Sequence, residues 1–175
     1  MHVLVAEDNL VNQKVISRML AEVDPSCTFT IVGDGQQALN YLASPPQTCP
    51  RPDLIFMDVT MPVLDGYAAT TILRTQPPFI TDPTLATTPI VAMTAGSINH
   101  QHQALRQRGF DDAIIKPIRF QSVKALFEFW ARRRIVLSQV PGPMRGLGVG
   151  GVRRDIVTMP PALEVRRYKG PKSTL

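Results

Sequence analysis

Five side chains that could bind a metal ion or a phosphoryl group stand directly after short, mostly apolar runs of this chain. Glu7 and Asp8 follow HVLVA, Asp58 follows LIFM, Thr94 follows PIVAM and Lys116 follows DAII. A lone aspartate after such a run is usually a helix cap or a turn residue. Polar groups in corresponding positions after four separate runs are harder to explain in that way, so we expect them to form one site.

Such a site could bind a divalent cation. Carboxylates that converge on one point repel each other, and Mg²⁺ takes oxygen ligands, usually one or two carboxylates together with water. No cysteine or histidine stands among these positions, which disfavours Zn²⁺. We therefore expect Mg²⁺ to be bound by Asp8, Asp58 and the backbone carbonyl of Thr60, with Glu7 acting through water.

Asp58 could then act as a nucleophile toward an activated phosphoryl group. Mg²⁺ and Lys116 would neutralise charge during the transfer, and the Thr94 hydroxyl could donate a hydrogen bond to the arriving group. Phosphorylation adds about −1.5 to −2 charges, so Thr94 and its loop would move toward the new anion. The site would then be a switch with little turnover.

The elements that position these side chains alternate along the chain. Apolar patterning predicts helices over 9–22, 36–42, 67–74, 98–108 and 120–130, and strands over 2–6, 28–32, 54–57, 89–93 and 112–115. Near-continuously apolar strands predict an α/β fold with a buried parallel sheet, which carries its chemistry at the carboxyl ends of the strands. The proline-rich segments 44–52 and 76–88 are expected to be loops.

The charge of the chain is divided unevenly. Residues 1–130 contain 9 Lys and Arg and 12 Asp and Glu, a net charge of −3, whereas residues 131–175 contain 10 and 2, a net charge of +8. The domain over 1–130 is therefore not expected to bind nucleic acid. The Gly- and Pro-rich tail over 131–175 is interpreted as a disordered basic extension, with electrostatic attachment to nucleic acid or to an anionic membrane as the alternative.

Together these motifs resemble the response-regulator receiver family. The resemblance covers about residues 2–130 and rests on VLVAEDNLVNQKV, PDLIFMDVTMPVLDGYAAT, PIVAMTA and IIKPI, four separated motifs in the order of the family. The segments EDNLVNQKV and MDVTMPVLDGYAAT are most similar to receivers attached to hybrid histidine kinases.

The resemblance implies a flavodoxin-like (βα)5 fold with strand order 2-1-3-4-5. It also implies Mg²⁺-dependent transfer of a phosphoryl group to Asp58 from a histidine kinase or a histidine phosphotransfer protein. Thr94, Ala95, Lys116 and Pro117 would bind the phosphoryl group and switch the surface formed by 98–108 and 112–115. The implied protein is cytoplasmic or nuclear, has no transmembrane segment and can dimerise on phosphorylation.

The chain departs from the family pattern at two places. Family members often carry an aromatic residue three positions before the lysine, and here that switch position is Ala113. The segment 76–88 is longer and richer in proline than is typical. These departures concern the coupling of the switch and the contacts with partners, and they leave the acceptor chemistry in place.

Three functions other than a phosphorylation switch fit the residues less well. An aspartate-nucleophile phosphohydrolase needs a second carboxylate two residues after the nucleophile, where this chain has Thr60. An interaction module without phosphotransfer would not need all five site residues. A nucleotide-binding domain would carry a G-x-G-x-x-G or P-loop sequence after the first strand, and neither is present.

Overall fold

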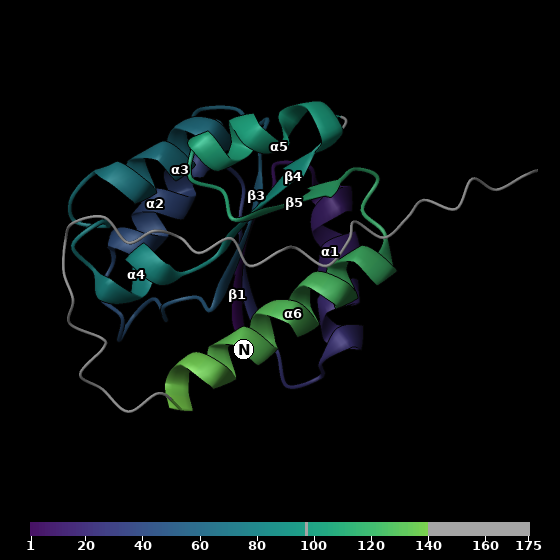
Figure 1. Ribbon diagram of the computed structural model, residues 1–175, viewed down its shortest axis with the longest axis horizontal. Coiled ribbons are helices and arrows are strands. Elements are labelled where there is room, and N and C mark those ends of the chain that lie inside the picture. Colours follow the sequence, from purple (N-terminus) through teal and green to yellow (C-terminus); the bar gives the residue numbers. More distant parts are fainter. Residues whose placement is uncertain (97, 140–175) are drawn as a thin grey trace, which may run out of the picture. The chain divides into compact units, whose positions relative to one another are not determined.

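Strands and helices alternate along the chain except for two successive helices before the fourth strand, as the computed structural model shows for residues 1–96 and 98–139 (Figure 1). The strands are β1 (His2–Ala6), β2 (Thr28–Val32), β3 (Leu54–Asp58), β4 (Ile90–Thr94) and β5 (Asp112–Ile115). The helices are α1 (Leu10–Val23), α2 (Gly35–Ala43), α3 (Gly66–Thr75), α4 (Pro83–Thr87), α5 (Ile98–Gln107) and α6 (Phe120–Gln139). None of the helices in these residues is long and apolar enough to cross a membrane.

The strands form one parallel sheet in the order β2-β1-β3-β4-β5, which confirms the predicted fold class and strand order. Ala6 at the end of β1 pairs with Met57 near the end of β3, and Asp58 pairs with Met93 of β4. The carboxyl ends of these three strands therefore lie level with one another. Any polar side chain at or just after those ends is brought to the same edge of the sheet.

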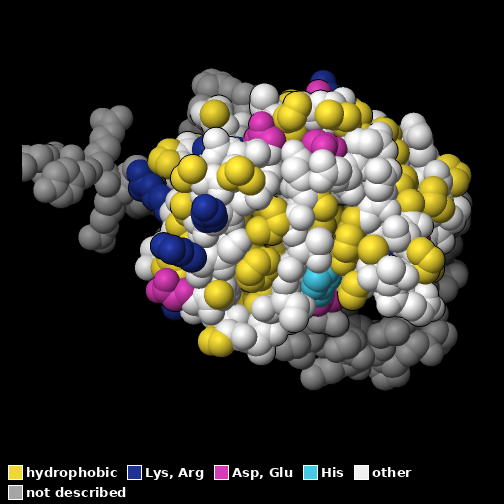
Figure 2. All heavy atoms as spheres, turned by 180° about the vertical axis from the view of Figure 1, so that it is seen from behind, with side chains coloured by type: hydrophobic (Ala, Val, Ile, Leu, Met, Phe, Trp, Pro, Cys, Tyr) yellow, Lys and Arg dark blue, Asp and Glu magenta, His cyan; other side chains and the backbone are white. Residues whose placement is uncertain are grey.

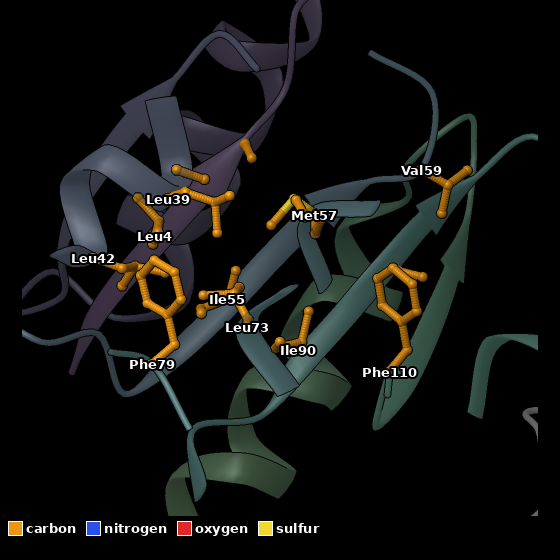
Figure 3. Packing of buried hydrophobic residues seen from close by; sticks show 14 of the residues in the cluster. Leu4, Leu39, Leu42, Ile55, Met57, Val59, Leu73, Phe79, Ile90 and Phe110 are labelled. Carbon is orange, nitrogen blue, oxygen red and sulfur yellow. The ribbon is translucent and has the colours of Figure 1, made fainter. Parts of the chain in front are cut away.

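Alternate side chains of each strand fill two separate cores, one on each face of the sheet. Figure 3 shows the first, where Leu4, Ile55 and Ile90 meet residues of α2, α3 and the segment 76–88 before β4, which we call the insertion. On the other face, Val5 and Phe56 pack against α1 and α6. Fully burying one such side chain stabilises the fold by about 1.5–3 kcal/mol, so the central strands have little freedom to shift.

Helix caps fix the short connections that follow the strands. Asn9 Oδ1 accepts hydrogen bonds from the backbone N–H groups of Val11 (2.9 Å) and Asn12 (3.2 Å) and so begins α1. Asp65 Oδ1 accepts one from Ala68 (2.7 Å) and begins α3. Such caps satisfy N–H groups that have no partner within the helix, and they set where each helix starts relative to its strand.

Two predictions of secondary structure were wrong. The segment 76–88 is not a continuous loop, because Asp82 caps the short helix α4 and Pro83 occupies its first turn, where proline is tolerated. The last helix was predicted to end at Trp130 and continues to Gln139, into the range assigned to the tail. Residues 140–175 lie outside the described residues, so the disordered extension and the domain boundary at 130 stay predictions.

The described surface is electrically mixed on the face seen in Figure 2. Acidic and basic side chains both occur there among hydrophobic ones, and the Lys and Arg side chains gather toward one side of that view. A broad surface of one sign, which phosphate backbones attract, is not formed on this face. The expectation that residues 1–130 do not bind nucleic acid stays a prediction.

Arg74 ties the insertion to the amino-terminal edge of the sheet. Its guanidinium donates hydrogen bonds to the carbonyls of Gly109 (3.0 Å), Leu85 (3.2 Å) and Thr88 (2.9 Å). It also forms an ion pair with Asp111 at 2.6 Å. One side chain thus joins α3, α4 and the turn before β5.

We expect Arg74→Ala to lower the free energy of unfolding by about 3–5 kcal/mol, because it leaves Asp111 and several carbonyls without their largely buried partner. Urea denaturation measures this loss. Arg18→Ala, at an exposed position of α1, is the matched control. Equal stability of the two variants would contradict the role given to Arg74.

Candidate functional site

Three carboxylates meet at the carboxyl edge of the sheet. Glu7 and Asp8 directly follow β1, and Asp58 ends the neighbouring strand β3. One ligand oxygen from each lies within 4.8 Å of the others. Glu7 and Asp58 are buried, whereas Asp8 is exposed to solvent. The structure thus brings together the three acidic residues that the sequence singled out.

Lys116 reaches the same point from the far side of β4. Its ammonium lies 2.5 Å from Asp58 Oδ2 and 2.8 Å from Glu7 Oε2. The backbone N–H of Lys116 donates to the carbonyl of Thr94 at 2.7 Å, which places the lysine next to the end of β4. The following residue, Pro117, is exposed and joined to Lys116 by a cis peptide bond.

Burial and charge act in opposite directions on these groups. Burial raises the pKa of the Asp58 carboxyl, although the Lys116 ammonium and the Thr60 N–H oppose that shift. Burial alone would lower the pKa of Lys116, but hydrogen bonds to Asp58 and Glu7 outweigh it and the pKa is raised overall. Lys116 therefore stays an ammonium at neutral pH. A cation bound beside Asp58 would favour its carboxylate form.

The backbone around Asp58 is closely packed. The N–H of Thr60 donates to Asp58 Oδ1 at 3.0 Å, which orients the carboxylate. Gly66, the first residue of α3, lies so close behind the strand that a Cβ there would overlap the carbonyl oxygen of Asp58. The predicted ligation by the Thr60 carbonyl stays a prediction.

Of the predicted switch residues, Thr94 is joined to Lys116 through its carbonyl. Thr94 is buried at the end of β4, and its Oγ1 accepts a hydrogen bond from the N–H of Gly96 at 3.1 Å. Ala95 is exposed. Ala113 on β5 pairs with Ala92 and is partly buried against the core that faces α2 and α3. Their predicted roles in switching stay predictions.

One residue of this site was missed in the sequence. Asn12 donates its side-chain amide to Glu7 Oε1 at 2.8 Å. The signal was its place five residues after Glu7, in the first turn of the helix that follows the strand. The hydrogen bond between Asn12 and Glu7 depends on the angle at which α1 leaves the sheet, and the sequence pattern does not specify this angle.

Comparison with known proteins agrees with the geometry. The model of the family described as response regulator receiver domain matches residues 3–128. The transcription factor SKN7 of Saccharomyces cerevisiae is 33% identical over 144 residues, which is 82% of this chain and 21% of that protein. The hybrid signal transduction histidine kinase I of Dictyostelium discoideum is 36% identical over 126 residues, 72% of this chain and 7% of the kinase. The chain thus corresponds to a small part of each relative's length.

A solved structure shows the same likeness. The receiver domain of the sensor histidine kinase PA1611 from Pseudomonas aeruginosa is 33% identical, with a TM-score of 0.59. The match covers 74% of this chain and 95% of that one, whose crystal structure has a magnesium ion coordinated in the active site cleft.

We expect Gly66→Ala to lower the free energy of unfolding by about 1–3 kcal/mol, because the added methyl group would push against the backbone of Asp58. Urea denaturation measures the change. The control is Gly33→Ala, whose Cβ would meet only the Gln37 side chain at 3.5 Å or more. If both variants are equally stable, the close packing behind Asp58 is not a constraint.

Proposed function

The chain belongs to the family of response regulator receiver domains, signalling modules of two-component systems, and on that premise we propose that Asp58 is its phosphoryl acceptor. The donor is a phosphohistidine of a histidine kinase or of a histidine phosphotransfer protein. The observation that carries the proposal is the convergence of Glu7, Asp8, Asp58 and Lys116 at one edge of the sheet.

The donor atoms fit Mg²⁺. They are carboxylate oxygens within 4.8 Å of one another, and the exposed position of Asp8 leaves space for the water that Mg²⁺ retains. Asp8, Asp58 and the Thr60 carbonyl would hold the ion, with Glu7 acting through water. The ion would neutralise charge on the transferring group. The magnesium ion in the PA1611 receiver domain supports this choice of metal.

Transfer needs a nucleophile and a cation that can follow the moving charge. An oxygen of Asp58 attacks phosphorus, the bond between phosphorus and the donor imidazole breaks, and the imidazole leaves with the electron pair. Lys116, which pairs with Asp58 Oδ2, would then pair with an oxygen of the phosphoryl group. Thr60 stands where a phosphohydrolase carries its second carboxylate, so the aspartyl phosphate would persist as a signal.

The signal would pass to the surface through Thr94. Its hydroxyl would donate a hydrogen bond to the phosphoryl group, and the loop with Ala95 would move with it. The face formed by α5 and β5 would change as a result. Because Ala113 replaces the aromatic residue, this movement would not depend on an aromatic rotamer. A phosphorylation-dependent dimer through this face is part of the proposal.

Exposed aliphatic side chains beside the site favour a protein as the donor. Leu10 and Val11, which follow Asp8, are 69% and 68% exposed, and Val63 in the loop after Asp58 is 83% exposed. Val63 also has a φ of 64°, which is costly for a β-branched residue. A small donor would gain nothing from these side chains, whereas a protein could bury them.

Incubation with acetyl phosphate and Mg²⁺ tests the acceptor. We expect wild type to gain one phosphoryl group that is stable in acid and labile in base, and Asp58→Asn to gain none, because an amide oxygen does not form the acyl phosphate. Intact mass spectrometry measures the adduct. Asp24→Asn, at the end of α1, is the control and should be labelled like wild type. Labelling of Asp58→Asn at the wild-type rate would overturn the assignment.

A second experiment tests the protein donor. Val63→Gly removes the apolar side chain and introduces a residue that adopts positive φ without strain. We expect it to slow transfer from a phosphorylated histidine phosphotransfer protein about five- to tenfold, a typical loss for a contact at an interface. Labelling by acetyl phosphate should be unchanged. Ile80→Ser, exposed in the insertion, is the control, and equal slowing of both donors would argue against a docking role.

A further inference from the structure

Glu7 is a carboxylate that needs partners on both oxygens. It is 1% exposed, and burial of an unpaired carboxylate is costly. Oε2 faces the Lys116 ammonium at 2.8 Å. Oε1 accepts a hydrogen bond from the side-chain amide of Asn12 at 2.8 Å and a longer one from the N–H of Asn9 at 3.4 Å. Among the described side chains, Asn12 is the donor that serves Oε1.

Asn12 is held in place before any ligand arrives. Its own N–H is bonded to the cap residue Asn9 at 3.2 Å. The next residue, Gln13, donates its amide to the carbonyl of Glu7 at 2.6 Å. These contacts hold the first turn of α1 against the end of β1. The Asn12 amide therefore points at Glu7 and has little conformational entropy left to lose when a ligand binds.

An amide is the right chemical type at this position. A lysine or arginine there would add positive charge beside the ion and weaken its binding. An aspartate would repel Glu7 and could not donate a hydrogen bond. A neutral donor orients the Glu7 carboxylate and leaves its negative charge available to the ion and its waters.

The contact also matters because Lys116 is shared. That ammonium bridges Glu7 and Asp58, and phosphorylation of Asp58 would draw it toward the phosphoryl group. The ion pair between Glu7 and Lys116 would then weaken. The Asn12 amide is engaged with the other oxygen and would keep Glu7 oriented through that exchange.

We propose that Asn12 is a positioning residue for the divalent-cation site, and that its amide sets the Mg²⁺ affinity of the chain by orienting Glu7. The inference rests on the proposed function, because the ion is the one assigned to that site. It adds a residue that touches neither the ion nor the phosphoryl group.

Isothermal titration with magnesium chloride tests the proposal. Loss of a partner that orients a metal-binding side chain typically costs about 10–100-fold in affinity, and because Glu7 acts through water we expect about tenfold weaker binding for Asn12→Ala. Asn12→Leu removes the donor but keeps the bulk of the side chain, and it should show the same loss. Asn40→Ala, on the exposed side of α2, is the matched control and should bind like wild type.

Labelling by acetyl phosphate separates positioning from a general loss of structure. Raised Mg²⁺ should restore the rate of Asn12→Ala to near the wild-type plateau, because the acceptor is intact and only the ion is bound more weakly. Wild-type Mg²⁺ affinity in both Asn12 variants would overturn the inference and leave the proposed function standing. A wild-type protein that binds no Mg²⁺ would overturn both.

Discussion

The pairing of β1 with β3 brings the buried carboxylates of Glu7 and Asp58 within 4.8 Å of each other, and the rest of the site depends on how their repulsion is balanced. Glu7 and Asp58 are nearly inaccessible to water, and both pair with the single ammonium of Lys116. Removing one partner of a buried ion pair destabilises the fold because it leaves an uncompensated charge. Loss of any one of the three groups is therefore expected to affect the other two. The same excess of negative charge is what would draw a divalent cation to the exposed carboxylate, Asp8.

Different interactions hold the two edges of the sheet. At the amino-terminal edge, Arg74 ties three elements together through hydrogen bonds to backbone carbonyls and an ion pair. At the carboxyl edge, caps and close contacts hold each strand end in place, with Gly66 packed behind Asp58 and Asn12 set against Glu7. The reactive groups are thus held by contacts at both edges of the sheet.

Much of this arrangement follows from pattern alone. The strands are short, apolar and buried, so their positions and the polar residues after them could be predicted, and β1 and β2 lie where expected. The helix α4 was missed because the prolines of the segment 76–88 favour a loop, although Asp82 and Pro83 form a cap and a first turn. The contacts of Asn12 and the double pairing of Lys116 could not be predicted, since they depend on side-chain directions that only the packed helices and strands determine.

The central claim is that Asp58 receives the phosphoryl group within this cluster. A crystal structure of the chain with Mg²⁺ and beryllofluoride, a stable mimic of a phosphoryl group on a carboxylate, tests it most directly. The account predicts beryllium bound to Asp58, Mg²⁺ about 2.0–2.1 Å from oxygens of Asp8 and Asp58, and Lys116 and Thr94 in contact with the fluorides. An adduct on another carboxylate, or an ion that does not touch Asp58, would contradict it.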